Sequence, residues 1–249
     1  MKRSALFGAV LLLVCAGGCN LIDTNGVHIG YSFDPQEFKQ SVGSGGAQMT
    51  LPQVACAPGQ MPDPCAAAQA QLPPDSGTVS CDSGACVAKV ELRLPETIDL
   101  RTAQTPLPSD AIQFGVDAVA IDHIAYWGSN KLNVDTPPVD LYVAAAAAMD
   151  ETDPTAVKLG SIAPIPAGSG RCGDPTDASD PAAKMGQMVC DVPLTDAGQA
   201  ALAAFIKGYK TAPFKLIVRA TVTAKGGDPV PQGTLDVFVR PSVTLSILK

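Results

Sequence analysis

Apolar and polar residues alternate with a period of two along most of the chain after Val87, as in strands that bury one face. The alternation is clearest near the C-terminus, where a turn at 226–228 separates two such runs. About eight short strands with turns between them predict a mainly β protein, an antiparallel immunoglobulin-like β-sandwich. The apolar positions that carry this prediction are Val90, Leu92, Leu94, Val119, Ile121, Ile124, Tyr126, Leu132, Val134, Leu141, Val143, Val157, Leu159, Ile162, Cys190, Val192, Leu194, Phe214, Leu216, Val218, Ala220, Val222, Leu235, Val237, Val239, Val243, Leu245 and Ile247.

Two interruptions modify the predicted strands. The alternation slips by one residue near Asp122 and His123, which predicts a β-bulge. Pro241 is predicted to separate two strands, because proline cannot donate to a strand ladder.

Helical signals are few. Thr195 is a predicted N-cap for one connecting helix over 196–207, which Gly208 ends. The segment from Asp34 to Glu37, after a predicted strand over 27–33, has the composition of a brief helix start. The alternative fold, a parallel α/β sheet, needs a helix between most strands, so the sandwich is favoured.

The N-terminus has the layout of a signal peptide. Lys2 and Arg3 precede an uncharged run from Ala5 to Gly18, which is shorter than the ~20 residues that a membrane-spanning helix needs. The alternative, a buried N-terminal helix, does not explain the two basic residues before the run and the small residues that end it.

The run ends in Ala16-Gly17-Gly18-Cys19, which resembles the lipobox of bacterial lipoproteins, although that family usually has Leu where this chain has Ala16. The resemblance implies cleavage after Gly18 and lipidation of Cys19 with a diacylglyceryl group, often joined by a third acyl chain such as palmitate. Two or three acyl chains give a durable membrane anchor. The residue after Cys19 is Asn20, whereas an Asp at this position would resemble an inner-membrane retention signal. We therefore expect a lipid-anchored envelope protein, on the periplasmic or surface face of the outer membrane.

The net charge of the chain narrows the classes of partner that it is expected to bind. Without Lys2 and Arg3 the 17 basic side chains fall to 15, against 24 acidic ones, which is a net charge of −9. Such a surface disfavours nucleic acid and anionic lipid headgroups.

Six cysteines remain after Cys15 and Cys19 are set aside: Cys56, Cys65, Cys81, Cys86, Cys172 and Cys190. An even number in an exported chain predicts disulfides. The expected pairs are Cys172 with Cys190, and Cys81 with Cys86 across the turn-forming residues 82–84. Zinc is disfavoured, because the chain has no Cys-x-x-Cys and only two histidines.

The signal peptide, the cysteines and the predicted strands divide the chain into four regions. They are a signal peptide over 1–18, a lipidated tether with a first short strand over 19–48, a cysteine-rich loop segment over 49–86, and the sandwich over 87–249. The loop segment is expected to lack regular structure.

Candidate chemistry is sparse. The chain has no nucleophile elbow, phosphate loop or dinucleotide fingerprint, and the Ser-x-x-Lys of 246–249 stands at its very end. Weak candidates are a calcium site at Asp174, Asp177 and Asp180, a carboxylate pair at Asp117 and Asp122, the histidines His28 and His123, and Tyr126-Trp127. The tryptophan is predicted to be buried in the core rather than exposed for stacking on a sugar or peptide.

The predicted function is therefore a lipid-anchored, non-catalytic binding or structural module without a cofactor, whose expected partners are the membrane and another envelope protein or a glycan. The alternatives are an envelope hydrolase with paired carboxylates and a calcium-dependent adhesion module.

Overall fold

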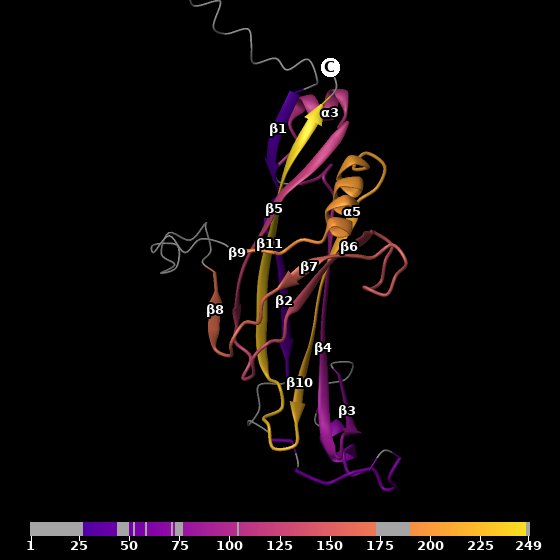
Figure 1. Ribbon diagram of the computed structural model, residues 1–249, viewed down its shortest axis with the longest axis vertical. Coiled ribbons are helices and arrows are strands. Elements are labelled where there is room, and N and C mark those ends of the chain that lie inside the picture. Colours follow the sequence, from indigo (N-terminus) through magenta and orange to yellow (C-terminus); the bar gives the residue numbers. More distant parts are fainter. Residues whose placement is uncertain are drawn as a thin grey trace, which may run out of the picture.

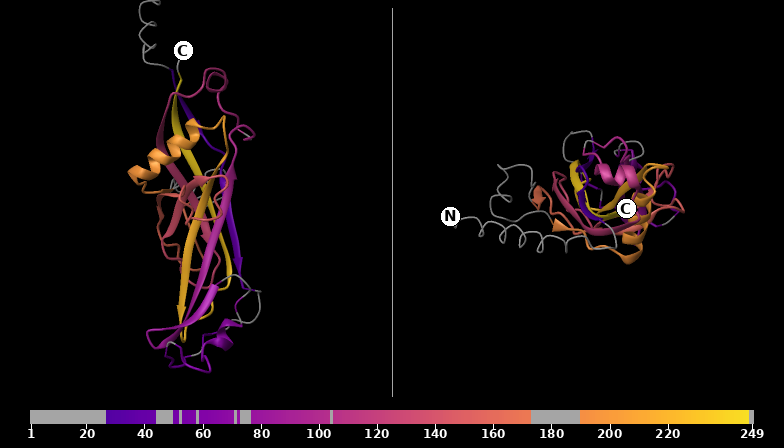
Figure 2. Two further views of the ribbon diagram at one scale, coloured as in Figure 1. Left: turned by 90° about the vertical axis from the view of Figure 1, so that its right-hand side faces the viewer. Right: turned by 90° about the horizontal axis from the view of Figure 1, so that it is seen from above.

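The computed structural model describes residues 27–43, 50–51, 53–57, 59–70, 72, 77–103, 105–172 and 190–247. Within them the chain is mainly β and every strand pair is antiparallel, which confirms the predicted fold class. The immunoglobulin-like strand order stays a prediction. The strands lie along the long axis of an elongated body (Figure 1; Figure 2).

The first sheet is built on the longest strand, β11 (Gly233–Ile247). One side of β11 pairs with two short strands in succession, and the other side pairs with β5, which pairs in turn with two more short strands. The members are β1 (Val27–Ser32), β2 (Gln36–Val42), β5 (Ala118–Asn130), β8 (Ser169–Arg171) and β9 (Cys190–Asp191).

The second sheet has the order β3-β4-β10-β6-β7. Its strands are β3 (Gly77–Asp82), β4 (Ala85–Ile98), β10 (Phe214–Lys225), β6 (Val139–Ala145) and β7 (Val157–Ile162). The alternating apolar positions face the interior, where Leu92, Leu141 and Val218 meet Val237 and Val239 of the first sheet, all fully buried. The two apolar faces thus form one core.

The predicted connecting helix is confirmed as α5 (Asp196–Lys207). Its N-cap is Thr195, whose Oγ1 accepts a hydrogen bond from the Gly198 N–H (3.0 Å). Gly208 is the C-cap, and Leu202 and Ile206 bury the expected face. Two short helices also occur, α2 (Ala66–Gln69) and α3 (Ser109–Phe114).

The predicted helix after Asp34 is wrong, because β2 occupies this segment. On one face Phe38 and Val42 are buried and Gln36 and Gln40 are half-buried, while Glu37, Lys39 and Ser41 on the other face are exposed. This two-residue period outweighs the local helix-start signal.

The predicted break at Pro241 is also wrong, since β11 runs through it. The Pro241 carbonyl accepts a hydrogen bond from the Phe33 N–H (3.0 Å), at the connection between β1 and β2. In an antiparallel strand the backbone N and O of one residue point to the same side. The position of the absent Pro241 N–H therefore faces the connection between β1 and β2, where no strand pairs with β11, so no ladder hydrogen bond is lost. The predicted bulge is confirmed: Ser242 pairs with His123 but Val243 pairs with Ile121, which leaves Asp122 as the extra residue.

The region 49–86 is more regular than expected, because it contains α2, β3 and the start of β4. It forms one end of the body, below β3 in Figure 1, whereas the start of β1 and the end of β11 lie at the opposite end with α3. The fifteen residues of β11, at about 3.3 Å each, span about 50 Å of the long axis. No helix among the described residues is long and apolar enough to cross a membrane.

Candidate functional site

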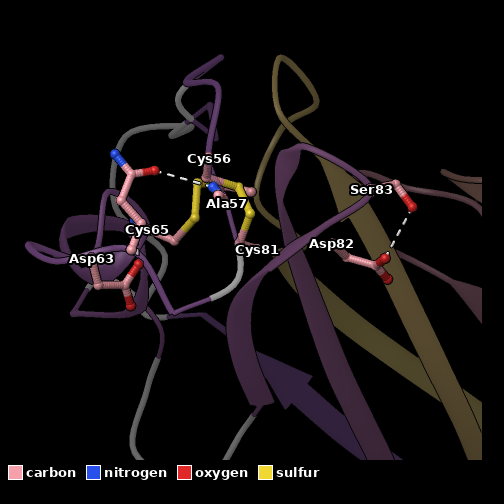
Figure 3. Close-up of a disulfide and its surroundings, with 9 residues drawn as sticks. Cys56, Ala57, Asp63, Cys65, Cys81, Asp82 and Ser83 are labelled. Carbon is pink, nitrogen blue, oxygen red and sulfur yellow. Dashed lines mark hydrogen bonds between the residues drawn. A yellow bond between two sulfur atoms is a disulfide. The ribbon is translucent and has the colours of Figure 1, made fainter.

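The end of the body opposite Val27 is held together by two disulfides, and Figure 3 shows the surroundings of Cys56–Cys81. We call this region the tip: residues 53–57 and 59–70, which we call the strap, with the β3–β4 hairpin. Cys56 is bonded to Cys81 and Cys65 to Cys86, so each disulfide joins the strap to one strand of the hairpin.

The predicted Cys81–Cys86 bond is therefore wrong. These residues are direct partners in the β3–β4 register and face the same side, but both bond to the strap instead. The predicted Cys172–Cys190 bond is confirmed. It joins the end of β8 to the start of β9, beside β5.

The hairpin turn is formed by Ser83 and Gly84, whose φ angles of 53° and 84° are both positive, as in a type I′ turn. Ser83 Oγ donates to Asp82 Oδ1 (3.0 Å). The sequence marked these residues as turn-forming, and the turn connects two strands rather than closing a small disulfide loop.

Local hydrogen bonds order the strap. The Ala57 N–H donates to Gln60 Oε1 (3.1 Å), and the Cys65 N–H donates to Asp63 Oδ1 (2.9 Å) (Figure 3). At the base of the strap the Cys56 N–H donates to the Gly84 carbonyl (3.2 Å). The strap thus has a defined shape although it contains only one helical turn.

The strap also presents apolar side chains to solvent. The described residues include four exposed large hydrophobic side chains, and two of them belong to the strap: Val54 at 40% and Met61 at 87% exposure. Beside the strap a polar hollow of about 420 Å³ is lined by Gln69, Gly77, Thr78, Lys89 and Glu91. Apolar side chains exposed singly are common on protein surfaces and do not by themselves identify a contact surface, whereas an ordered loop is a frequent location of binding residues.

The sulfur atoms of Cys56, Cys65 and Cys86 lie within 4.8 Å of one another. This closeness follows from the two neighbouring disulfides, and a disulfide sulfur is not a thiolate ligand for zinc. The calcium candidates Asp174, Asp177 and Asp180 and the lipidation candidate Cys19 lie outside the described residues.

The candidate carboxylates are not brought together. Asp122 is exposed on β5 and accepts a hydrogen bond from Thr244 Oγ1 (3.1 Å), while Asp117 stands before the start of that strand. Among the described carboxyls, every resolved pKa shift is downward. In Asp99 a hydrogen bond from Arg101 lowers the pKa to about 2, and for Asp140 burial is outweighed by hydrogen bonds from Lys158 and Ser161, which lower its pKa. The acid of a glycosidase needs the opposite shift.

The two histidines are exposed and lie on different strands. His28 Nδ1 shares a hydrogen bond with Ser246 Oγ (2.9 Å) across the β1–β11 pair. His123 is at the β5 bulge.

Trp127 is buried, with 4% exposure, which confirms the predicted burial, but it lies outside the core cluster between the two sheets. Tyr126 belongs to the core, so the next side chain along β5 points to the outer face of the first sheet. There the indole stacks on Phe238 (centroids 5.5 Å apart, 5° between planes), with the Arg240 guanidinium 5.8 Å from its centre.

A buried acid on the outer face of the second sheet was missed by sequence reasoning. Glu151, whose side chain is 3% exposed, lies 3.3 Å from Arg93 and 3.0 Å from Arg219. It attaches the β6–β7 connection to β4 and β10, so its role is structural. The alternation along β4 and β10 indicated two outward arginines, but not which acid would pair with them.

Comparison with protein-family models, curated proteins and solved structures finds no significant match.

Proposed function

We propose that this chain is a lipid-anchored envelope protein, attached through Cys19, which presents its tip away from the bilayer as a non-catalytic binding surface. One observation carries the proposal: β1 starts at the end of the body opposite the tip. Only seven residues lie between Cys19 and Val27, a reach of at most about 30 Å, so the anchor acts on the end remote from the tip.

The disulfides support an exported location, because such bonds persist in oxidising compartments. They also support a binding role for the tip. A strap that is already ordered loses little conformational freedom when a partner binds, which favours affinity.

The anchor is tested with Cys19→Ala. We expect the wild-type protein to remain with membranes after a high-salt wash and to have an intact mass that begins at Cys19 and includes acyl chains. The variant should be absent from the washed membranes. A wild-type mass that begins at Met1, or one without acyl chains, contradicts the proposal.

The tip is tested with a photo-crosslinking residue in place of Met61 or Met149. These side chains are almost equally exposed, at 87% and 84%, but Met149 lies in the β6–β7 connection rather than in the strap. In intact cells we expect a discrete crosslinked product from position 61 and none from position 149. Equal crosslinking at both sites, or crosslinking at 149 alone, argues against a binding role for the tip.

A further inference from the structure

The polar hollow beside the strap lies where β3 begins. β3 pairs with β4 only as far as Gly77, which stands opposite Val90. Glu91 is the next residue of β4, so no residue of β3 lies opposite it. The hollow of about 420 Å³ is thus at the place where the second sheet loses one strand.

Three polar side chains of these two strands line the hollow. Thr78 and Lys89 are direct partners in the β3–β4 register, and Glu91 follows two residues after Lys89 on β4. Val90, between them, is fully buried in the core, so its two neighbours point to the outer face of the sheet. A hydroxyl, a cation and a carboxylate therefore share one face, with the two charged residues about 7 Å apart along the strand.

Gln69 forms the side of the hollow that belongs to the strap. Its Nε2 donates to the Gly77 carbonyl (3.4 Å), and its Oε1 accepts a hydrogen bond from the Val79 N–H (2.5 Å). Cys65, the N-cap residue of the helix that ends in Gln69, is bonded to Cys86 of β4. This side is thus fixed before a ligand arrives, which lowers the conformational entropy lost on binding.

Both charged side chains of the hollow already have partners in the protein. Lys89 Nζ lies 3.6 Å from Asp82 Oδ2, and Glu91 Oε2 lies 3.0 Å from Arg93 Nη2. An ionic ligand would replace one exposed ion pair by another, which gains little free energy. A hydroxyl group can instead accept a hydrogen bond from the Lys89 ammonium, or donate to the second carboxylate oxygen of Glu91, without breaking either pair.

The lining also disfavours an apolar ligand. Small-molecule sites have volumes of about 300–1,000 Å³ and are usually lined mainly by apolar side chains. This hollow has a volume in that range, but none of the five described residues that line it has a large apolar or aromatic side chain. A ligand that fits this lining is uncharged and rich in groups that both donate and accept hydrogen bonds.

We propose that the hollow binds an uncharged sugar residue of a glycan. Each sugar hydroxyl can donate and accept, so hydroxyls of one ring can accept from Lys89, donate to Glu91 and exchange a hydrogen bond with Thr78. This inference rests on the proposed binding role of the tip and names the class of its ligand. Because a few hydrogen bonds exchanged with water contribute little each, a single sugar should bind with a dissociation constant in the millimolar range.

The test is an NMR titration of the nitrogen-15-labelled mature lipoprotein, in a detergent without a sugar headgroup. The uncharged probes are glucose, galactose, mannose and N-acetylglucosamine, and the charged ones are glucosamine and glucuronate. We expect at least one uncharged sugar to shift the amide signals of Thr78, Lys89 and Glu91 saturably. Neither charged sugar should bind more tightly than that one.

Thr78→Val removes the hydroxyl but keeps the shape of the side chain, and should weaken binding of that sugar about tenfold. Thr97→Val is the matched control, because Thr97 is exposed further along β4, about 20 Å from Glu91, and should leave the affinity unchanged.

Absence of a shift at these three amides with all four uncharged sugars overturns the proposal. Crosslinking from position 61 then shows independently whether the tip binds a partner of another class. Tenfold tighter binding of glucosamine or glucuronate also overturns it, because the site then selects for charge. Equal affinity of Thr78→Val and wild type contradicts the assigned position of the sugar.

Discussion

Asn130 is fully buried at the end of β5 and is satisfied entirely by main chain. Its Nδ2 donates to the carbonyls of Val134 (2.9 Å) and Ile165 (2.8 Å), and its Oδ1 accepts from the Leu132 N–H (2.9 Å). One side chain thus connects the end of a strand to the loop that precedes β8.

Asn130→Ala should therefore destabilise the fold, because it removes the side-chain partner of the Leu132 N–H and the Val134 carbonyl, while the Ile165 carbonyl keeps the Thr136 N–H (3.1 Å). We expect the free energy of unfolding in urea to fall by about 2–4 kcal/mol. Ser41→Ala, at an exposed position on β2, should change it by less than about 0.5 kcal/mol. A loss below 1 kcal/mol for Asn130→Ala would mean that water replaces the amide at this site.

Tyr31 predicts a stability change at high pH. Burial of its ring, with the nearby negative charge of Asp34, raises its pKa to about 12, and its hydroxyl donates to the Thr105 carbonyl (2.7 Å). The folded state favours the neutral phenol, so the contribution of Tyr31 to the free energy of unfolding is complete below pH 10 and is lost as the pH rises towards 12. The difference in unfolding free energy between wild type and Tyr31→Phe should shrink over this range. A difference that is constant from pH 9 to 12 contradicts the shift.

For single residues, the sequence identified those whose structural role depends on nearby positions in the chain. The Thr195 cap and the Ser83–Gly84 turn depend on neighbours within a few positions, and both could be predicted. The partners of Cys81 and Cys86 could not, because six cysteines allow fifteen pairings and the strap reaches them through the tertiary fold.

Among the elements, α5 and the C-terminal strands were predicted because long periodic segments give the strongest signal. β2 and β3 were missed because each is short and follows residues with turn or helix-start chemistry. β11 was predicted as two strands because the place where a proline is tolerated depends on where β1 ends and β2 begins.

The α5 cap has a second function that gives a test at the level of elements. Thr195 Oγ1 serves both the Gly198 N–H and the Lys158 carbonyl on β7. Thr195→Ala should lower the free energy of unfolding by about 1–2 kcal/mol and speed amide exchange in the first turn of α5. Thr195→Ser keeps the hydroxyl and should stay within about 0.5 kcal/mol of wild type. Equal losses in the two variants would assign the effect to the methyl group.

For the whole molecule, the three disulfides close loops of similar length, with sequence separations of 25, 21 and 18. Each should contribute about 3 kcal/mol by the chain-entropy estimate. Their local effects should differ, because Cys56–Cys81 fastens the strap, in which Gln69 Oε1 accepts a hydrogen bond from the Val79 N–H (2.5 Å), whereas Cys172–Cys190 joins β8 to β9.

We therefore expect Cys172→Ser/Cys190→Ser to lower the free energy of unfolding by about 3 kcal/mol without changing amide exchange at Val79. Cys56→Ser/Cys81→Ser should cause a similar loss and faster exchange at Val79. Amide hydrogen exchange at Val79 is measured in both double variants under conditions below the unfolding transition. Faster exchange at Val79 in the first variant would show that the two ends of the body are coupled.

The arrangement of the whole molecule is the part that the sequence could least predict. The cysteine-rich region begins at residue 49, directly after the predicted tether over 19–48. The structure places it at the opposite end, because β1 and β2 pair in succession along β11 and together follow it from one end of the body towards the other (Figure 1). Proximity in the chain therefore does not indicate proximity to the anchor.

The most direct test of the central claim is the distance of the tip from the bilayer. A fluorescent amino acid is placed either at Ser83 in the hairpin turn or at Ile112 on α3, which is 52% exposed at the other end. The lipoprotein is then reconstituted into vesicles that carry an energy acceptor in the lipid. We predict strong energy transfer from position 112 and weak transfer from position 83. Equal transfer from both sites, or stronger transfer from position 83, would contradict a tip held away from the membrane.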